Sequence, residues 1–275
     1  MTYIIVSAIA FGAMAIFARY AYGAGADVLG VLLARFVIAG AVLSAIMLAL
    51  RKPWPRGRPL AAAMGMGAIG YAGQAACYFA ALNHASAGLV ALLLYAYPTL
   101  VCLLAAMFLK ERLTPRIAAL LALSFVGIAL TLGGGHGTPA GFALSLAAAL
   151  IYSVYIIVGA RELKGTDALA SATVICLSAA ATMVLASCFR SPLLPAEASG
   201  WVPLVLIALV STVLAILTFF AGLRRVGPAK ASIASTLEPV VTVVLAWFVL
   251  AEAIAPVQLV GGALVLGSAA WLARR

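Results

Sequence analysis

The chain is built from apolar runs long enough to cross a lipid bilayer, separated by short polar stretches. A helix needs about 20 mostly apolar residues to span a hydrocarbon core of about 30 Å, and runs such as Ala229 to Leu250 reach this length. The runs predict an all-α integral membrane protein with ten transmembrane helices. The predicted spans are 3–22, 28–50, 59–82, 85–108, 115–132, 142–160, 168–188, 200–222, 229–250 and 256–273.

Composition indicates that lipid is the main solvent of this chain. Of its 275 residues 66% are hydrophobic and 9% are charged, whereas a soluble domain averages about 25% charged residues. The short loops leave no room for a soluble domain, and the runs lack the alternation of a transmembrane β-barrel. We expect the run at 3–22 to be the first helix and not a signal peptide, because no basic segment precedes it and its apolar part is too long.

The distribution of basic residues predicts the orientation. If the N-terminus is cytoplasmic, 14 of the 17 Lys and Arg residues fall in cytoplasmic loops or at the C-terminus. This is the positive-inside pattern, so both termini are expected in the cytoplasm. The net charge of +10 is therefore an orientation signal, and no nucleic-acid partner is expected. The expected location is a plasma membrane, where the chain contacts lipid as a monomer.

A sequence repeat at an offset of 141 residues divides the chain into two halves. The matched positions are Phe79–Leu82 with Phe220–Leu223, Phe11 with Tyr152, Pro98 with Pro239, Glu111 with Glu252, and Pro115 with Pro256. We predict two repeats of five spans each, at residues 1–135 and 136–275. An odd number of spans inverts the second repeat in the membrane. Inverted repeats are typical of secondary transporters, whose substrate sites lie near the midplane at the repeat interface.

Three stretches resemble a known family. EPVVTVVLAWFVLAEAIAPVQLVGGALVLGSAAWL (Glu238–Leu272) and YPTLVCLLAAMFLKERLTPRIAALLALSFVGIAL (Tyr97–Leu130) resemble the ends of the two repeats of EamA-type carriers. VLLARFVIAGAVL, which contains Arg35, fits the second span of that pattern. The chain thus resembles EamA-type carriers of the drug/metabolite transporter (DMT) superfamily over essentially its whole length. It is also similar, less closely, to the bacterial aromatic amino-acid exporters of that superfamily.

The resemblance implies ten helices in two inverted five-helix repeats around a central cavity. It also implies transport of small metabolites, commonly export of amino acids or related compounds. One feature departs from the pattern: small multidrug members of the superfamily carry a glutamate in their first helix, whereas SAIAFGAMAIFA (Ser7–Ala18) and its counterpart Leu146–Val158 contain no acid. Obligatory proton antiport through such a residue is therefore not expected.

Two charged residues, Arg35 and Glu238, lie well inside predicted spans and away from their ends. A charge at the bilayer centre costs about 2.5–3.5 kcal/mol on insertion scales, which makes both candidates for function. Glu238 is either a proton- or amine-binding group that faces a cavity, or a structural carboxylate bonded to a neighbouring helix or to Arg35. Arg35 either anchors a substrate carboxylate or extends its long stem towards the outer interface or a helix end.

Pro98 and Pro239 lie inside spans at matched positions of the two repeats. Each proline removes one backbone hydrogen bond and frees a carbonyl one turn earlier, near Leu94 and Ser235. In lipid, such a carbonyl is tolerated only where protein or a water-filled cavity satisfies it. The prolines are either static kinks or hinges for alternating access. Both interpretations place the fourth and ninth spans at a cavity wall.

Aromatic and polar residues inside the spans are the candidates for a cavity lining. Tyr71, Gln74 and Tyr78 share one helix face by their spacing, beside glycines 67, 70 and 73 that allow close helix approach. An aromatic cage with a few amides and hydroxyls suits the ring and ammonium of an amino acid, although each of these residues is also explained by simple packing. The further candidates are Tyr95, Tyr152, Tyr155, Phe219, Ser232, Ser235 and Thr236.

These features favour a secondary transporter that exports small metabolites, most specifically aromatic or neutral amino acids, by alternating access. A multidrug or other metabolite exporter of the same fold is the alternative, and a channel is a more distant one. No GxxxxGK[ST] motif is present, so ATP is not expected to drive transport directly. An enzyme is not expected, because His84, His136 and the GGGHG turn at 133–137 form no catalytic set. The four cysteines have no metal-ligand spacing, so no metal or cofactor is expected.

Overall fold

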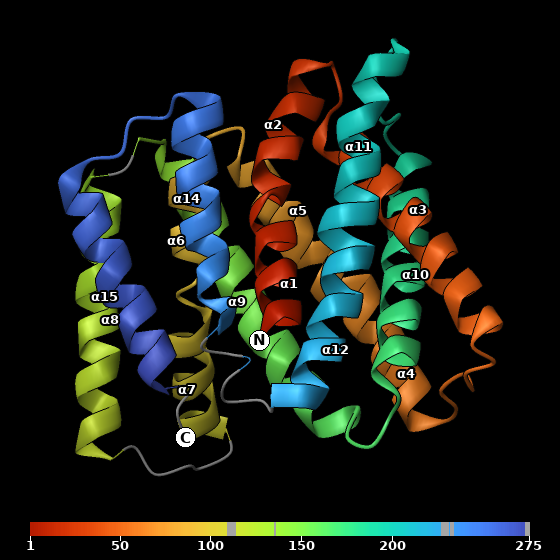
Figure 1. The fold of residues 1–275 in the computed structure, drawn as a ribbon, viewed down its shortest axis with the longest axis horizontal. Helices are drawn as coiled ribbons and strands as arrows, with labels where there is room; N and C mark the ends of the chain where they lie inside the picture. The colour runs from red at the N-terminus through yellow and green to blue at the C-terminus, as the bar shows by residue number, and fades with distance from the viewer. Residues whose placement is uncertain (109–113, 135, 227–230, 232–233, 273–275) are drawn as a thin grey trace.

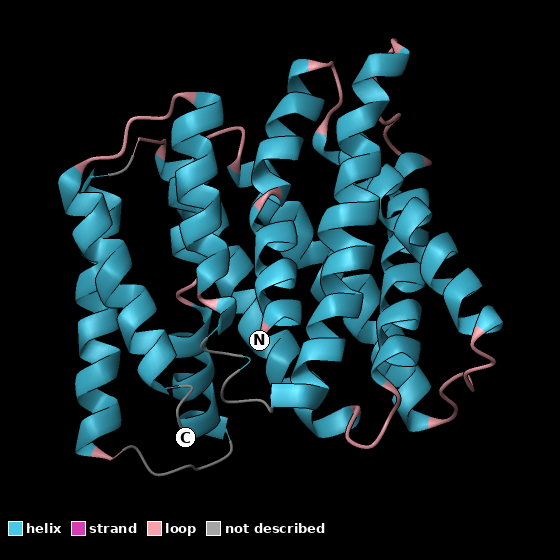
Figure 2. Cartoon of the chain, in the orientation of Figure 1, coloured by secondary structure: helices cyan, strands magenta, loops and turns pink. Residues whose placement is uncertain are grey.

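A computed structural model describes residues 1–108, 114–134, 136–226, 231 and 234–272. Within these ranges the chain is helical with short loops, and the only β contact is an isolated bridge between Ala85 and Gly137 (Figure 2). Each of the ten predicted ranges overlaps helical segments. In the described part of the chain, seven helical segments are long and apolar enough to cross a membrane. They are Thr2–Gly23, Val28–Ala49, Ala87–Leu104, Ile117–Gly134, Pro139–Glu162, Ala168–Ser187 and Ala198–Val226.

The helices of the two predicted repeats follow one another in the same order. The elements up to Gly134 are α1 (Thr2–Gly12), α2 (Met14–Gly23), α3 (Val28–Ala49), α4 (Arg58–Gly65), the π-helix η1 (Met66–Tyr71), α5 (Ala72–Ala81), α6 (Ala87–Leu94), α7 (Tyr97–Phe108) and α8 (Pro115–Gly134). Those that follow are α9 (Pro139–Glu162), α10 (Ala168–Ser187), the 3₁₀-helix η2 (Ala198–Gly200), α11 (Trp201–Ala208), the π-helix η3 (Leu209–Leu214), α12 (Ala215–Val226), α14 (Leu237–Leu250) and α15 (Pro256–Leu272).

Local sequence explains where several helices begin. Asp27 caps α3 by accepting a hydrogen bond from the Gly30 N–H at 2.7 Å, and Thr138 caps α9 from a position just before Pro139. Such caps satisfy backbone N–H groups that have no partner at a helix start. Proline at the first helical position lacks only an N–H group that would be unpaired there anyway. Because bilayers contain no water to satisfy these groups, the caps mark where each helix reaches the polar boundary.

Two predicted spans contain a π-helical turn. The segment from α4 through η1 to α5 covers the predicted span 59–82, and the segment α11–η3–α12 covers the predicted span 200–222. A π turn inserts one extra residue into a helix and shifts the register of everything beyond it. The two π-helices occupy overlapping positions when the chain is moved by 141 residues. Hydropathy does not reveal them, because apolar residues run through them without interruption.

The proline-containing spans are broken before each proline. The fourth predicted span divides into α6 and α7 at Tyr95 and Ala96, and the helix that contains Pro239 is interrupted by a turn at Thr236. Figure 1 shows that α6 ends and α14 begins near mid-height of the bundle. The breaks lie three residues before each proline, so the proline itself is already part of the following helix.

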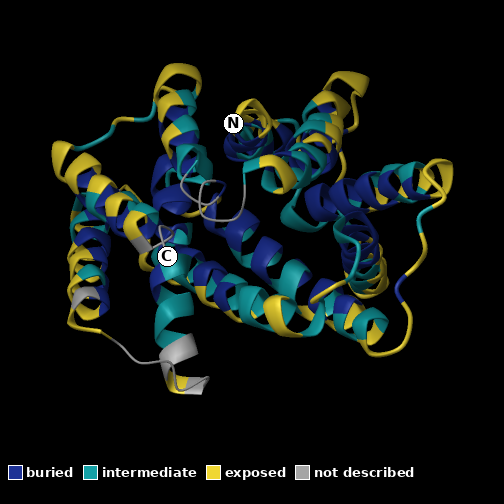
Figure 3. Ribbon diagram, turned by 60° about the horizontal axis from the view of Figure 1, so that its bottom comes forward, coloured by how far each residue is buried: buried dark blue, intermediate teal, exposed yellow. Residues whose placement is uncertain are grey.

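The helices pack as a bundle in which each predicted repeat contacts the other. In Figure 1, α8 and α15 lie side by side at the left edge, and α3 and α10 lie together at the right. Between them α6 packs on α14, α5 on α9, and α12 on α1. Figure 3 shows buried residues facing the interior of the bundle and exposed residues on its flanks. Large apolar side chains such as Ile69 and Phe248 are among the exposed ones, as expected of a surface that faces lipid.

Candidate substrate site

Five tyrosines form a continuous row of ring contacts through the middle of the bundle. The centroids of Tyr71 and Tyr155 are 6.1 Å apart, and those of Tyr155 and Tyr152 are 5.8 Å apart in a stacked arrangement. The row continues edge to face from Tyr152 to Tyr97 at 4.8 Å and from Tyr97 to Tyr95 at 5.5 Å. These spacings lie in the range of favourable aromatic pairs. All five rings come from different turns of η1, α6, α7 and α9, so tertiary packing assembles the row.

Arg35 lies at the Tyr71 end of the row. Its side chain on α3 donates one hydrogen bond from Nη2 to the Tyr71 hydroxyl at 2.7 Å and one from Nε to Thr212 Oγ1 at 3.0 Å. The guanidinium also lies over the rings of Phe36 at 5.0 Å and Phe79 at 5.5 Å. Only 3% of Arg35 is exposed, and no carboxylate of the described residues lies within 4.0 Å of it. The arginine is therefore buried without extending to the outer interface.

The two hydroxyl partners of Arg35 belong to the two π-helices. Tyr71 is the last residue of η1, and Thr212 lies inside η3. These residues are separated by 141 positions, the same offset that relates the predicted repeats. Thr212 itself donates to the Ile207 carbonyl at 2.9 Å, five residues earlier, which is the spacing of a π turn. One guanidinium thus joins the corresponding π turns of both halves.

Glu238 lies at the opposite end of the tyrosine row. Its Oε2 accepts a hydrogen bond from the Tyr95 hydroxyl at 3.0 Å, and the same hydroxyl lies 2.7 Å from the Ser235 carbonyl. Tyr95 is 4% exposed, whereas Glu238 is only partly buried. No Lys or Arg of the described residues lies within 4.0 Å of the Glu238 carboxylate. The row of rings therefore connects a buried cation to a partly buried carboxylate, and neither has an ion-pair partner among the described residues.

The Ser235 carbonyl is the one that Pro239 leaves without its helical partner. Proline has no N–H, so the carbonyl four residues earlier receives no hydrogen bond within the helix. The Tyr95 hydroxyl, from the broken span of the first half, donates to it instead. In that half, Ser153 Oγ donates to the Tyr97 carbonyl at 3.2 Å beside the break before Pro98. The carbonyl that Pro239 frees in the second half is thus satisfied by a side chain of the first half.

The other residues that the sequence predicted for the cavity lining are not part of the tyrosine row. Gln74 and Tyr78 are buried, and the Tyr78 ring contacts Phe79 at 5.7 Å. Phe219 contacts Phe220 and makes no ring contact with the tyrosine row among the described residues. Ser235 Oγ donates to the Ala231 carbonyl at 2.9 Å, the back-bond that is common for serine in membrane helices. Ser232 lies outside the described residues.

Sequence reasoning missed two members of this site. Tyr97 is the ring that links Tyr152 to Tyr95 in the row, and Thr212 is one of the two hydrogen-bond partners of Arg35. The 141-residue offset is a signal for both, since Tyr97 corresponds to Glu238 and Thr212 corresponds to Tyr71. The glycines at 67 and 70 do allow close approach as expected. A Cβ at Gly67 would overlap the Ile175 carbonyl of α10, and one at Gly70 would lie 3.1 Å from the Tyr155 ring.

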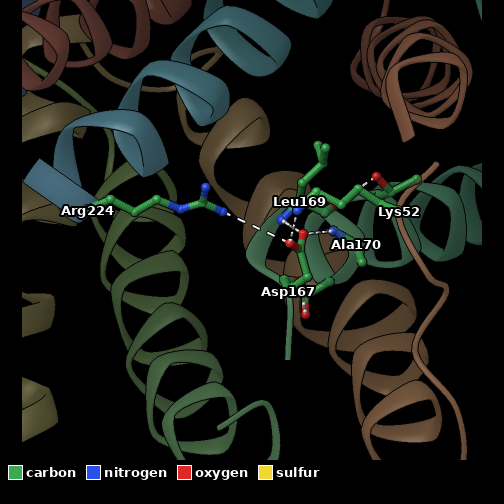
Figure 4. A network of polar contacts seen from close by, with 7 residues as sticks. Lys52, Asp167, Leu169, Ala170 and Arg224 are labelled. Carbon is green, nitrogen blue, oxygen red and sulfur yellow. Dashed lines mark hydrogen bonds and ion pairs between the residues drawn. The ribbon is translucent and has the colours of Figure 1, made fainter. Parts of the chain in front are cut away.

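Charged residues outside the apolar spans pair at the two ends of the bundle. In Figure 4, Asp167 caps α10 by accepting from Leu169 N at 3.0 Å and Ala170 N at 3.1 Å, while Lys52 Nζ lies 2.9 Å away and Arg224 4.0 Å away. The hydrogen bond from Lys52, aided by these backbone N–H groups, holds the pKa of Asp167 below its usual value against the opposing effect of burial. These contacts join α3, α10 and α12 at one end.

At the opposite end, Glu252 connects the predicted halves. Its carboxylate accepts from Ala87 N at 2.8 Å and Gly88 N at 3.2 Å, at the start of α6. Arg19 of α2 lies 3.5 Å from the same carboxylate and 3.4 Å from the Ala85 carbonyl. A carboxylate at a helix N-terminus is favoured by the unpaired N–H groups and the helix dipole. This contact holds α2, α6 and the end of α14 together.

A groove of about 780 Å³ lies on the flank of the bundle, away from the tyrosine row. Its walls come from α2 with the residues that flank it, the η2–α11 segment and α14, and they include Phe17, Leu206 and Leu245. None of the predicted cavity residues lines it. The groove is apolar and open at the side, so its surface is of the kind that lipid covers.

The chain matches a known transporter family over both of its halves. The EamA-like transporter family matches residues 1–133 and again residues 139–274. The chain belongs to this family. It is therefore a membrane transporter of the drug/metabolite transporter superfamily and not an enzyme, and the resemblance seen in the sequence is confirmed.

Relatives of the chain are named as exporters and transporters. The aromatic amino acid exporter YddG of Ancylobacter novellus is 31% identical over 87% of this chain and 86% of its own length. A probable terminal-alkyne amino-acid exporter of Streptantibioticus cattleyicolor is 33% identical over 91% of this chain and 86% of its own length. The uncharacterized transporter YcbK of Bacillus subtilis is 26% identical over 94% of this chain and 88% of its own length.

A solved structure has the same overall arrangement. It is a crystal structure of a protein that is 28% identical, and the match has a TM-score of 0.66 over 97% of this chain and 94% of that chain. Bacterial relatives together with the apolar helices indicate a bacterial inner-membrane protein.

Proposed function

We propose that this EamA-family transporter is a secondary exporter of amino acids, with aromatic and neutral amino acids as its substrates. Relatives named as exporters of aromatic and terminal-alkyne amino acids, at 31% and 33% identity, support this substrate class. The observation that carries the proposal is the tyrosine row between Arg35 and Glu238. It places a cation, a surface of aromatic rings and a carboxylate in sequence along one path through the bundle.

This set of groups offers a partner to each part of an aromatic amino acid, whose ammonium and carboxylate share one carbon. Arginine recognises carboxylates with two parallel donors, aromatic faces attract rings and ammonium groups, and a carboxylate pairs with an ammonium. In the proposed site the substrate ring lies against Tyr152 and Tyr155, and its ammonium pairs with Glu238. Its carboxylate, on the same carbon as the ammonium, is attracted by Arg35 from the other end of the row. Tyr71, Tyr95 and Tyr97 complete the wall, while Gln74, Tyr78, Phe219, Ser232 and Ser235 are proposed as its surroundings.

We further propose a ten-helix fold of two inverted repeats, residues 1–135 and 136–275, with alternating access around the site. Matched packing supports it: α5 lies on α9, and the segments 141 residues away, α12 and α1, also lie together. The two separate matches to the family support the division near residue 135. The proposed orientation places both termini in the cytoplasm, on the same side as Lys52 and Arg224, in agreement with the basic loops.

Proteoliposomes test the proposal directly. Purified protein is reconstituted, loaded with unlabelled L-phenylalanine and assayed for counterflow of the labelled amino acid, with and without a pH gradient. We expect saturable counterflow that aromatic and neutral amino acids inhibit. Control vesicles without protein give the background, and Tyr152→Ala tests the ring surface. Flux that does not saturate, or that no amino acid inhibits, would show that the protein is not an amino-acid exporter.

Export of other small organic cations is the second candidate. It is favoured by the partly buried Glu238 carboxylate, which has no cationic partner within 4.0 Å among the described residues and lies beside tyrosine rings. The same assay distinguishes the two, because phenethylamine retains the ring and ammonium of phenylalanine and lacks only its carboxylate. If phenethylamine competes as well as phenylalanine, the carboxylate is not recognised and the cation exporter is correct.

A further inference from the structure

The Tyr95 hydroxyl has two acceptors and a single proton to give them. It lies 2.7 Å from the Ser235 carbonyl and 3.0 Å from Glu238 Oε2. A phenol donates one hydrogen bond at a time, although its oxygen also accepts. Tyr95 comes from the end of α6 in the first half, while both acceptors belong to the ninth predicted span in the second half. The hydroxyl is therefore a shared donor across the two halves.

The Ser235 carbonyl depends on this donor. Pro239 lacks the N–H that would bond to it in a regular helix. Within a bilayer an unpaired carbonyl is costly, since no water is present to replace the missing donor. When Tyr95 donates to Ser235, the backbone at the break before Pro239 is satisfied. When Tyr95 donates elsewhere, that carbonyl loses its partner.

The charge on Glu238 decides between these arrangements. An ionised carboxylate is a stronger acceptor than a carbonyl, because charge-assisted hydrogen bonds are about twice as strong as neutral ones. It therefore draws the Tyr95 proton away from Ser235. A carboxyl that has taken one proton from water instead donates to the Tyr95 oxygen, and Tyr95 then donates to Ser235. An ammonium that pairs with the carboxylate donates to it in place of Tyr95, so the Tyr95 hydroxyl can again donate to Ser235.

We propose that the Tyr95 hydroxyl is a positioning group that couples the occupancy of Glu238 to the helix break at Thr236. The coupling rests on the proposed export of ammonium-bearing substrates. With a proton at Glu238, the chain of hydrogen bonds from Glu238 through Tyr95 to Ser235 is complete. With an ammonium at Glu238, the carboxylate accepts from the ammonium, and Tyr95 is free to donate to Ser235. In the empty carrier with ionised Glu238, the Tyr95 hydroxyl donates to the carboxylate, and the Ser235 carbonyl is left without a donor. Movements of the broken helix are thereby favoured in the loaded carrier, and exchange of cargo is faster than return of the empty carrier.

The surroundings of Glu238 leave Tyr95 as its hydrogen-bond partner. The titratable groups of the described residues that interact with it electrostatically are tyrosines of α5, α6, α7 and α9 and of η1. They are Tyr71, Tyr78, Tyr95, Tyr97 and Tyr152, all uncharged at neutral pH. From α1 the neighbour is Gly12, where a Cβ would lie 2.7 Å from the Glu238 carbonyl oxygen. Arg19 of α2 bonds instead to Glu252 at the end of the bundle.

The first test compares exchange with net efflux of labelled L-phenylalanine from proteoliposomes. In the wild type we expect exchange to be about fivefold faster than net efflux, the effect of one hydrogen bond present only in the loaded state. Tyr95→Phe leaves Ser235 without the donor in every state, so the ratio should fall to about one. A wild-type ratio in Tyr95→Phe would overturn the proposal.

Tyr22→Phe is the matched control. The Tyr22 hydroxyl also donates to a backbone carbonyl, that of Phe79, at the same distance of 2.7 Å. It has no contact with Glu238 among the described hydrogen bonds, so its loss tests a tyrosine-to-carbonyl bond without the carboxylate. We expect Tyr22→Phe to keep the wild-type ratio of exchange to net efflux. If both variants lower the ratio equally, the effect is one of general helix packing and the proposal fails.

Infrared difference spectra between acid and neutral pH test the hydrogen bond without transport. The carboxyl C=O band of protonated Glu238 is identified by its absence in Glu238→Gln. We expect this band to move to higher frequency in Tyr95→Phe, because its O–H loses the tyrosine acceptor, and to stay in place in Tyr22→Phe. An unmoved band in Tyr95→Phe would overturn the proposal even if no amino-acid flux were found, whereas absent flux with a moved band would refute only the proposed substrate.

Discussion

The two buried charges of this transporter have opposite surroundings. Arg35 is 3% exposed and is held by two hydroxyls and three aromatic rings on continuous helical segments. Glu238 is partly exposed, has one tyrosine hydroxyl as partner, and lies beside a break in its helix. The difference suggests a division of labour in which Arg35 fixes the structure around one end of the tyrosine row and Glu238 responds to cargo at the other.

The two halves share backbone features but differ in the polar side chains at matched positions. The π turns and the helix breaks recur at an offset of 141 residues, at Tyr71 and Thr212 and at Tyr95 and Thr236. The side chains at these positions differ, and the chemically active residue of each pair has no equivalent in the other half. Arg35 corresponds to Cys176. The π turns and helix breaks are therefore common to both halves, while the polar side chains of the site differ between them.

The largest expected effect is on stability at the fixed end. Arg35→Lys keeps the charge but has one nitrogen, so it cannot bond to Tyr71 and Thr212 with the same fork. We expect a loss of about 2–3 kcal/mol in unfolding free energy, because hydrogen bonds to charged groups are the strong ones. SDS denaturation in mixed micelles measures it. Arg190→Lys is the control, since that side chain is 76% exposed near Asp27 and should change stability little. Equal stability of both variants would contradict a fixed role for Arg35.

Two glycines, Gly12 beside Glu238 and Gly40 on the helix that carries Arg35, should differ in how well they tolerate a methyl group. A Cβ at Gly12 would lie 2.7 Å from the Glu238 carbonyl oxygen, whereas one at Gly40 of α3 would meet the Leu177 side chain at 3.0 Å. A backbone atom cannot give way as a flexible side chain does. We therefore expect Gly12→Ala to cost about 2 kcal/mol through overpacking and Gly40→Ala less than about 0.5 kcal/mol, offset by the better helix propensity of alanine. Both are read from SDS denaturation. The contrast disappears if α1 and α14 can separate freely.

The responsive end should show a large effect on transport and a small one on stability. Glu238→Gln removes the charge but keeps an oxygen that accepts from Tyr95, so we expect stability within about 0.5 kcal/mol of the wild type. Counterflow of L-phenylalanine should fall about tenfold or more, the loss of an ion pair with the ammonium being worth about 1.4 kcal/mol. Its dependence on a pH gradient should disappear. Wild-type flux with an unchanged gradient dependence would remove Glu238 from the site.

The smallest expected effect on stability comes from the ion pair between Asp167 and Lys52 outside the bilayer. It shows what an exposed charge contributes, for comparison with Arg35 and Glu238. The hydrogen bond from Lys52, with the backbone N–H groups of Ala170 and Leu169, holds the folded-state pKa of Asp167 below its unfolded value. Its stabilisation is therefore complete above the unfolded pKa of about 3.9 and is lost as pH falls through the lower folded value. Asp167→Asn retains a capping oxygen, so we expect a loss of about 0.5 kcal/mol at pH 7 that vanishes in acid. Thermal unfolding from pH 3 to 7 measures it. A loss that persists in acid would point to the cap and not the charge.

Much of the architecture was accessible from the sequence because it depends on features read along the chain. Apolar runs of bilayer length predicted helices, and each predicted range overlaps helical segments. The tails that begin at Tyr97 and Glu238 carried the family resemblance, which the comparisons confirmed. Proline at 98 and 239 predicted a kink or a hinge in each span, because a missing N–H has the same consequence in any helix. The π turns left no such mark, since they change hydrogen bonding without changing hydropathy.

The site itself was only partly accessible. Tyr71, Tyr95, Tyr152 and Tyr155 were candidates by type and place, but nothing in their spacing showed that Tyr97 joins them into one row. Whether a buried polar residue packs or functions depends on what meets it from other helices. Gln74 and Tyr78 share a face with Tyr71, as the helical period requires, yet they are buried while Tyr71 binds Arg35.

The sequence alone therefore determines the class of this protein, whereas tertiary packing decides the contacts in its site. Hydropathy, charge asymmetry and the 141-residue repeat already determine a helical membrane transporter, because the bilayer acts on each segment in turn and forces its backbone to satisfy itself. The partners of Arg35 and Glu238 are decided only when segments far apart in the chain pack together. Side-chain hydrogen bonds between Arg35 and Thr212, or Tyr95 and Glu238, depend on distances of a few ångströms that no local pattern encodes.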